Sequence, residues 1–170
     1  MLERHVFLIG MPGCGKSSLG KKVGNLTRVP YVDTDARITE GIGCSVPDIF
    51  AHYGEQAFRN AETNVLIGLT RERGSLVSTG GGMVLRDNNR AIMRNHGVIV
   101  LIDRPLEDIM SDIKLDRRPL LAQKGLSEVE RLYHERIAIY RSVADIVLDN
   151  SHGYHAGVRE LESIVRYMGG

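Results

Sequence analysis

The feature that most restricts the fold is a glycine-rich loop at residues 10–17, which reads GMPGCGKS and fits the pattern G-x-x-x-x-G-K-[ST]. An apolar run at residues 6–9 precedes it, and an amphipathic segment at residues 19–26 follows. Glycines in such a loop let backbone N–H groups turn inward around an anion, and the N-terminus of the next helix adds positive charge. The loop therefore predicts a nucleotide-binding unit in which Lys16 reaches the β and γ phosphates and the Ser17 hydroxyl binds Mg²⁺.

Further short apolar runs indicate buried strands of a parallel sheet. They lie at residues 31–32, 76–78, 98–102 and 146–148. The segments between them show helical spacing, for example at residues 129–140, with charges interleaved. Strands that alternate with helices form βαβ units, in which helices cover both faces of a parallel sheet. We therefore expect a three-layer α/β fold.

Two segments depart from this simple alternation. Residues 34–73 have room for about two or three helices between two strands, so we expect an insertion over one end of the sheet. Residues 112–125 contain several basic side chains, a proline and no clear periodicity, which is typical of a flap or lid. A chain of 170 residues suits one hydrophobic core, so we predict a single domain over residues 1–170.

The composition excludes several classes of protein. The formal net charge is +1, from 22 Lys and Arg against 21 Asp and Glu, so we expect neither nucleic-acid binding nor membrane binding. The two cysteines, Cys14 and Cys44, have no zinc-ligand spacing and suit a reducing compartment. No apolar run approaches the roughly 18 residues of a membrane span, and none fits a signal peptide. We therefore expect a soluble, unprocessed, cytoplasmic monomer.

A nucleotide loop alone leaves three classes of protein open: a small-molecule kinase, a GTP switch and an ATPase module of a larger machine. A GTP switch usually needs an Asn-Lys-x-Asp element that reads the base, and this sequence lacks one. An ATPase module usually places Asp-Glu after an apolar strand, whereas Asp103 and Arg104 follow the run at residues 98–102. A kinase for a small acceptor therefore fits best.

Two carboxylates follow the second predicted strand. Asp33 and Asp35 are two residues apart, and side chains at that spacing on a strand point the same way, so both are expected to face the phosphate loop. One carboxylate can hold Mg²⁺ or its waters, and the other can accept a hydroxyl proton, as phosphoryl transfer requires. An exposed turn, where Asp is common, is the alternative interpretation.

An arginine and a glycine run supply candidate contacts to the acceptor. Arg59 and Glu62 are three residues apart on a predicted helix, so Glu62 can hold the guanidinium for bidentate capture of a carboxylate. A surface ion pair is the simpler interpretation of this spacing. Gly80, Gly81 and Gly82 follow a predicted strand, where ligands bind outside the carboxyl ends of a parallel sheet. We expect them to bring the backbone close to a ligand.

More basic side chains lie in the second half of the chain. Arg117 and Arg118 belong to the predicted lid, whose closure can bring a guanidinium onto the transferring phosphate and exclude water. Arg136 lies on the next predicted helix and is a candidate second clamp for the acceptor. Each of these arginines can equally be a solvated surface charge.

Taken together, these motifs resemble those of shikimate kinase in order and spacing over about residues 5–150. The motifs are the loop at residues 10–17, Asp33-x-Asp35, G-x-x-x-F-R-x-x-E at residues 54–62, the three glycines at residues 80–82, R-P-L-L at residues 118–121 and R-x-x-x-Y at residues 136–140. The resemblance implies a P-loop, nucleoside-monophosphate-kinase-like fold with a five-stranded parallel sheet. It also implies transfer of the γ-phosphate of ATP to the 3-hydroxyl of shikimate, a step in aromatic amino acid biosynthesis, with Mg²⁺ as cofactor.

The resemblance also implies roles for individual residues. Lys16 binds phosphate, Ser17 is a Mg²⁺ ligand, and Asp33 holds Mg²⁺ through water. Asp35 contacts the shikimate hydroxyls and acts as the base, and Arg118 is the lid arginine that also contacts ATP. The remaining implied contacts are Gly13, Cys14, Gly15 and Ser18 to ATP, and Arg59, Gly80, Gly81, Gly82 and Arg136 to shikimate, with Glu62 supporting Arg59.

The sequence departs from the family pattern at the adenine pocket. Some members sandwich adenine between an arginine before the lid and a proline near the last helix, where this chain has Ser111 and His155. Arg117 beside Arg118 leaves the choice of lid arginine open. Two other functions remain open as well: a kinase for a related acceptor such as gluconate, and a nucleotide-binding regulatory module without catalysis.

Overall fold

The computed structural model describes residues 2–115 and 119–170, without the side chains of residues 113–124. In this part of the chain, a five-stranded sheet has the order β2-β3-β1-β4-β5. Its strands are β1 (His5–Ile9), β2 (Tyr31–Asp33), β3 (Leu76–Ser78), β4 (Gly97–Asp103) and β5 (Ile146–Asp149). Every pairing between neighbouring strands is parallel, and the predicted α/β fold is confirmed.

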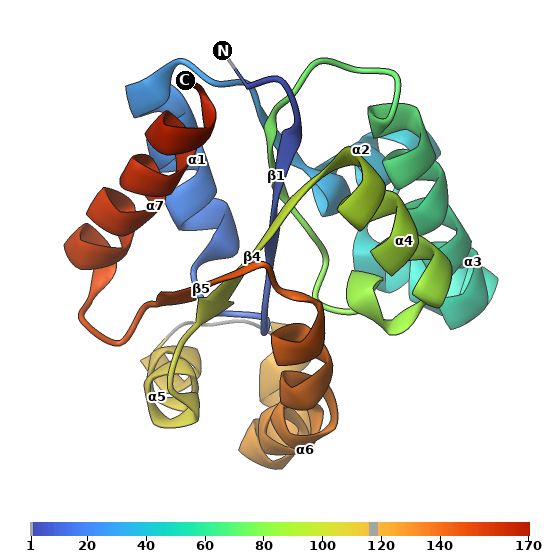
Figure 1. Ribbon diagram of the computed structural model, residues 1–170. Coiled ribbons are helices and arrows are strands. Elements are labelled where there is room, and N and C mark those ends of the chain that lie inside the picture. Colours follow the sequence, from blue (N-terminus) through green and yellow to red (C-terminus); the bar gives the residue numbers. More distant parts are fainter. Residues whose placement is uncertain (1, 116–118) are drawn as a thin grey trace.

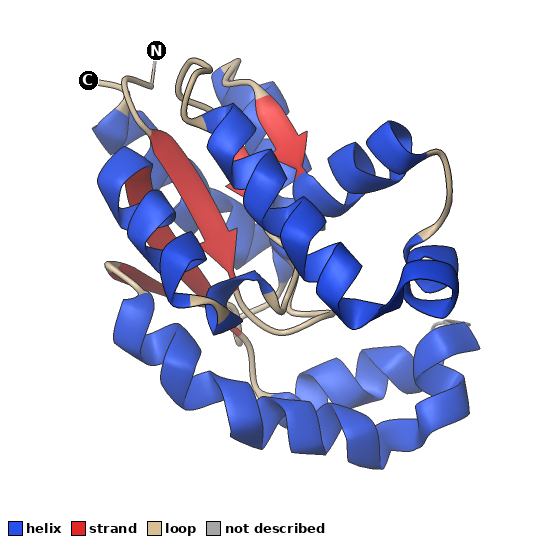
Figure 2. Ribbon diagram, turned by 90° about the vertical axis from the view of Figure 1, so that its right-hand side faces the viewer, coloured by secondary structure: helices blue, strands red, loops and turns tan. Residues whose placement is uncertain are grey.

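Helices cover both faces of this sheet. The helices of the described chain are α1 (Lys16–Thr27), α2 (Thr34–Ile42), α3 (Val46–Leu69), the short 3-10 helix η1 (Met83–Leu85), α4 (Asp87–His96), α5 (Leu106–Leu115), α6 (Pro119–Val143) and α7 (Tyr154–Met168). α1 and α7 lie on one side of the sheet, and α3 and α4 lie on the other (Figure 1). α5 and α6 lie together at the end of the molecule where β1 and β4 finish (Figure 1 and Figure 2). Among the described helices, none is both long and apolar enough to cross a membrane.

β1 lies at the centre of the sheet and is buried along its whole length. It pairs with β3 on one side and with β4 on the other. An apolar run of this kind is what a strand covered on both faces requires. Because the sheet continues in opposite directions from β1, the carboxyl end of this strand is a topological switch point, where ligands bind in such sheets.

The predicted insertion at residues 34–73 contains α2 and α3. Gly54 interrupts α3 with φ of 80° and ψ of 169°, a backbone conformation that glycine adopts readily, so this helix is divided into two parts. Ile38, Ile49 and Phe58 form a small apolar cluster in this segment, separate from the main core. The insertion therefore has its own packing centre.

The position of Asp35 differs from the expectation. β2 ends at Asp33, and α2 begins at Thr34, so Asp35 lies in the first turn of a helix and not on a strand. Asp33 Oδ1 accepts hydrogen bonds from the N–H groups of Asp35 and Ala36 at 3.0 and 3.3 Å, and thereby caps α2. The prediction that Asp33 and Asp35 lie on one strand was wrong, because this cap ends the strand.

The segment predicted as a lid, residues 112–125, is helical in backbone where it is described. α5 continues to Leu115, and α6 begins at Pro119, a residue that is favoured in the first turn of a helix. Gly125 interrupts α6 with φ of 75°. Among the described residues of this segment, the backbone departs from helical geometry at Gly125.

Candidate active site

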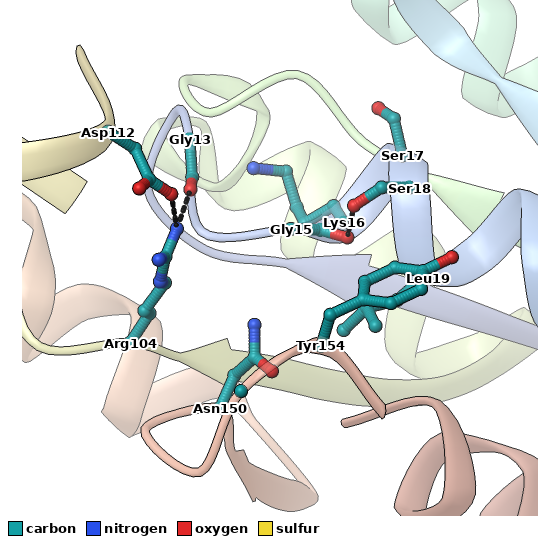
Figure 3. A pocket seen from close by; sticks show the side chains of 11 residues that line it. Gly13, Gly15, Lys16, Ser17, Ser18, Leu19, Arg104, Asp112, Asn150 and Tyr154 are labelled. Atoms are coloured by element: carbon teal, nitrogen blue, oxygen red, sulfur yellow. Dashed lines mark hydrogen bonds and ion pairs between the residues drawn. The ribbon is translucent and has the colours of Figure 1, made fainter. Parts of the chain in front are cut away.

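The glycine-rich loop joins β1 to α1 at the carboxyl end of the central strand (Figure 3). Gly10, Gly13 and Gly15 have φ of 139°, 83° and 107°, which L side chains rarely adopt. α1 begins at Lys16 with no side-chain cap and no acidic residue in its first turn. Its first N–H groups therefore lack intrahelical partners and favour an anion. Lys16 Nζ donates to the carbonyl oxygens of Gly10 and Met11, both at 2.8 Å, so its charge lies inside the loop.

A cavity of about 450 Å³ lies beside this loop. Residues that follow β4 and β5 also line it, among them Arg104, Asn150 and Tyr154 (Figure 3). Asn150 Nδ2 donates to the Cys14 carbonyl oxygen at 2.9 Å, which ties the loop to the end of β5. Sequence reasoning missed Asn150, although its place close behind the strand predicted at residues 146–148 is a signal for a ligand-site residue. Cys14 is fully buried, so its side chain packs in the interior.

Arg104 is a second residue of this cavity that sequence reasoning missed. Its Nη1 donates to the Gly13 carbonyl oxygen at 3.2 Å and to the Asp112 carboxylate at 2.6 Å, so it connects the loop with α5. Its place directly after β4 is again the available signal. Ser111 and His155, the residues expected at the adenine pocket, lie in the described part of the chain but do not line this cavity.

Ser17 and Asp33 lie together next to the first turn of α1. Ser17 Oγ donates to Asp33 Oδ2 at 3.0 Å, and Ser78 Oγ lies 3.1 Å from the same hydroxyl. The Tyr31 hydroxyl also donates to Asp33 Oδ2, at 3.2 Å. A hydroxyl and a carboxylate beside a phosphate loop are hard oxygen ligands, and Mg²⁺ is usually bound by one or two such groups together with phosphate oxygens. These residues therefore fit a Mg²⁺ site.

Asp35 carries an unpaired carboxylate oxygen and interacts electrostatically with Lys16 and Arg59. Its Oδ1 is buried and has no hydrogen-bond partner among the described residues. Burial is the main cause that raises the pKa of this carboxyl above its usual value, and the charge of Asp33 adds to the effect. Lys16 and Arg59 lower the same pKa, so Asp35 lies within electrostatic reach of both. A carboxylate in this state can accept a proton from a hydroxyl group.

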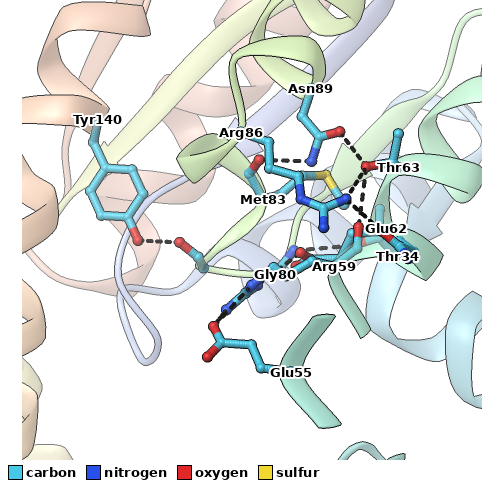
Figure 4. A network of polar contacts seen from close by, with 12 residues as sticks. Thr34, Glu55, Arg59, Glu62, Thr63, Gly80, Met83, Arg86, Asn89 and Tyr140 are labelled. Carbon is cyan, nitrogen blue, oxygen red and sulfur yellow. Dashed lines mark hydrogen bonds and ion pairs between the residues drawn. The ribbon is translucent and has the colours of Figure 1, made fainter. Parts of the chain in front are cut away.

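Arg59 is held between two glutamates of α3 (Figure 4). Its Nη1 donates to Glu62 Oε2 at 2.8 Å, and its Nε and Nη2 donate to Glu55 Oε1 at 3.3 and 3.1 Å. Glu62 is fully buried, and burial raises its pKa while Arg59 opposes that rise. The predicted contact between Arg59 and Glu62 is confirmed, and it is a partly buried pair, because the Arg59 side chain is 12% exposed and that of Glu62 is 0% exposed.

The glycine run after β3 leaves room for these charged groups. A Cβ atom on Gly80 would lie 2.7 Å from Asp35 Oδ1 and 2.8 Å from Glu62 Oε1. A Cβ atom on Gly82 would overlap the guanidinium group of Arg59. A side chain at either position would therefore displace at least one of these charged groups.

Tyr140 of α6 holds the middle of this glycine run in place (Figure 4). Its hydroxyl donates to the Gly81 carbonyl oxygen at 2.6 Å, and its ring is buried. Burial is the main cause that raises the pKa of Tyr140 to about 12, so the hydroxyl stays protonated and remains a donor at neutral pH. α6 thus fixes the backbone of the glycine run.

Replacement of Tyr140 by phenylalanine is expected to lower the free energy of unfolding by about 1 kcal/mol, because the Gly81 carbonyl loses its donor while the packing is kept. Urea unfolding measures this difference. Tyr53→Phe is the matched control, because Tyr53 is 63% exposed. Equal stability losses in the two variants would show that the hydrogen bond to Gly81 contributes nothing.

A second cavity, of about 480 Å³, lies between α3 and α6. Arg59 and Arg136, which are far apart in the sequence, both line it, together with the apolar side chains of Phe50 and Leu85. Among the described residues, no carboxylate forms an ion pair with Arg136. Guanidinium groups beside apolar side chains suit a small ring compound with a carboxylate.

The other predicted site residues lie as follows. Ser18 lines the cavity beside the glycine-rich loop, where its Oγ donates to the Gly15 carbonyl oxygen at 3.0 Å. Gly80 N–H donates to Thr34 Oγ1 at 3.0 Å, which joins the glycine run to α2. Arg118, the predicted lid arginine, and its neighbour Arg117 lie outside the described residues.

Comparison with known proteins finds relatives over almost the whole chain. The model of the shikimate kinase family matches residues 12–166. Shikimate kinase of Clostridium beijerinckii is 35% identical over 164 residues and covers 96% of both chains. Shikimate kinase of Aromatoleum aromaticum is 38% identical, over 95% of this chain and 94% of the relative.

A solved structure supports the same relationship. Shikimate kinase from Acinetobacter baumannii in complex with shikimate has a TM-score of 0.86 and 29% sequence identity, over 97% of this chain and 92% of that chain. The resemblance that the motifs indicated is therefore confirmed. The chain belongs to the shikimate kinase family.

Proposed function

We propose that this protein transfers the γ-phosphate of ATP to the 3-hydroxyl of shikimate, giving shikimate 3-phosphate and ADP in aromatic amino acid biosynthesis. The position of Asp35 carries this proposal, because its carboxylate lies within electrostatic reach of Lys16 in the phosphate loop and of Arg59 in the second cavity. A base between a phosphate site and a carboxylate site suits transfer to a hydroxy acid. The relative from A. baumannii is described in complex with shikimate, which supports the same acceptor.

On the nucleotide side, Lys16 binds the phosphates and stabilises the charge that develops on the transferred group. Ser17 and Asp33 would hold Mg²⁺, Asp33 through water, and the contact of 3.0 Å between Ser17 Oγ and Asp33 Oδ2 supports this assignment. Bound Mg²⁺ would neutralise charge on the β and γ phosphates. The other proposed contacts to ATP come from Gly13, Cys14, Gly15 and Ser18.

On the acceptor side, Asp35 orients the 3-hydroxyl and takes its proton at Oδ1 as the oxygen attacks the γ-phosphate. Arg59 and Arg136 bind the carboxylate at the other end of the ring, and the buried Glu62 keeps Arg59 in place. Contacts at both ends of a small ring restrict its orientation in a way that one ion pair does not. The backbone of Gly80, Gly81 and Gly82 contacts the ring hydroxyls.

The chain is further proposed to act as a single kinase domain. Residues 34–73 bind the acceptor, and residues 112–125 form a lid that brings Arg118 onto the phosphates and excludes water. The separate apolar cluster of Ile38, Ile49 and Phe58 supports the role of the first segment as a structural unit. The near-neutral net charge of +1 suits a monomer that works in the cytoplasm on small molecules.

A coupled assay of ADP release in the presence of Mg²⁺ tests this function. ADP formation is expected to depend on shikimate and to be absent with gluconate at the same concentration. Phosphorus NMR of the product is expected to place the new phosphate on the 3-hydroxyl. ADP release that is indifferent to shikimate would contradict the proposal, and turnover of gluconate in its place would identify a different acceptor.

A further inference from the structure

Glu55 lines the second cavity, between α3 and α6, which is the acceptor cavity of the proposed function. There it covers one edge of the Arg59 guanidinium (Figure 4). Its Oε1 accepts hydrogen bonds from Nε and Nη2 of Arg59 at 3.3 and 3.1 Å, while Nη1 donates to Glu62 Oε2 at 2.8 Å. Glutamates of its own helix therefore occupy both sides of this guanidinium. A ligand carboxylate needs one of these edges for a bidentate contact.

The two glutamates differ in how readily they can leave Arg59. The side chain of Glu62 is 0% exposed, and a buried carboxylate separated from its cation is very unfavourable. The side chain of Glu55 is 64% exposed, and exposed pairs at this helical spacing are weak. An entering carboxylate therefore displaces Glu55 and leaves Glu62 in place.

We infer that Glu55 is an internal competitor of the acceptor carboxylate, which holds the Nε and Nη2 edge of Arg59 until a ligand takes its place. This inference rests on the proposed function and identifies Glu55 as a residue that sets the affinity of the protein for the acceptor. A neutral ligand lacks the negative charge that compensates for displacing a carboxylate from this edge, so Glu55 raises the selectivity of the cavity for acids.

The other charged side chains of the cavity agree with this competition. Arg131 forms ion pairs with Glu128 and Glu135 along α6, so these two acids have a cation of their own. Among the described residues, Arg136 has no carboxylate ion-pair partner. A bound carboxylate therefore gains an electrostatic interaction with Arg136 and takes the place of Glu55 at Arg59.

The test is Glu55→Gln in the full chain. The KM for shikimate is expected to fall about two- to fivefold, with kcat and the KM for ATP unchanged within about twofold, since the variant removes only a competitor for ground-state binding. Cyclohex-1-ene-1-carboxylate carries the acid without the hydroxyls, and its Kd, measured by isothermal titration calorimetry, is expected to fall by a similar factor. The Kd of methyl shikimate, a neutral ester, is expected to stay as in the wild type.

Glu162→Gln is the matched control, because Arg166 Nε and Nη2 donate to Glu162 Oε1 at 2.9 and 2.7 Å in the same geometry on α7, outside the acceptor cavity. The KM, kcat and Kd values of this variant are expected to equal those of the wild type. An unchanged KM in Glu55→Gln would overturn the inference, and a higher KM would assign Glu55 to holding Arg59 in place. A wild type that does not phosphorylate shikimate would refute the proposed function, whereas the Kd of the cyclohexene carboxylate tests Glu55 without turnover.

Discussion

Replacement of Asp35 by asparagine is expected to lower kcat with shikimate by about 10² to 10⁴-fold, the usual contribution of a positioned general base. The amide keeps the shape of the side chain but cannot take the hydroxyl proton that the unpaired Oδ1 of Asp35 is placed to accept. The phosphate contacts of Lys16 do not depend on this carboxylate, so the affinity for ATP is expected to persist. A coupled kinase assay and calorimetric titration with ATP measure the two effects.

The same variant is expected to have a higher melting temperature at neutral pH. Burial raises the pKa of Asp35, so the folded state disfavours the charged form, and the stability that this group provides when protonated is lost as the pH rises through the raised pKa. Asparagine removes this cost. Asp108→Asn is the control, because Asp108, like Asp35, is a carboxylate in the first turn of a helix, here α5. Robust turnover by Asp35→Asn would rule out Asp35 as the base.

Alanine at Gly82 is expected to raise the KM for shikimate by about 10- to 100-fold, or about 1.4 to 2.8 kcal/mol of lost binding. The added Cβ would overlap the guanidinium of Arg59, which must then move away from its place in the acceptor cavity. Gly82 has φ of −94°, a conformation that alanine adopts without strain, so the chain is expected to fold. Steady-state kinetics measures the KM for shikimate, and circular dichroism checks that the variant is folded.

Gly41→Ala is the matched control for this substitution. A Cβ atom on Gly41 would meet nothing within 4 Å, although this glycine also lies in the predicted acceptor insertion. Its KM for shikimate is expected to equal that of the wild type. A folded Gly82→Ala variant with the same KM would show that Arg59 does not need its observed position to bind the acceptor.

The strands could be predicted from the sequence because each requirement is local. A strand that helices cover on both faces needs an apolar side chain at nearly every position, and short runs of this kind mark each strand of the five-stranded sheet. The order β2-β3-β1-β4-β5 could not be read from those runs. It depends on which strands pair across long stretches of chain.

The candidate site could be predicted in part. The loop at residues 10–17 was identified with its lysine and serine because its spacing reflects one strand, one turn and one helix. The two aspartates were identified for a wrong reason, since Asp33 caps a helix that contains Asp35. Arg104 and Asn150 were missed because single polar residues after a strand carry no motif of their own.

By itself, the sequence determined the family, the glycine-rich loop, the strands and the spacing of Arg59 and Glu62, because these features depend on residues close together in the chain. Only the tertiary structure decided that Arg59 lies against Gly82 and shares a cavity with Arg136. It also decided that Glu62 is buried while Glu55 stays exposed. Long-range contacts and burial follow from how the helices pack on the sheet, which no short stretch of sequence contains.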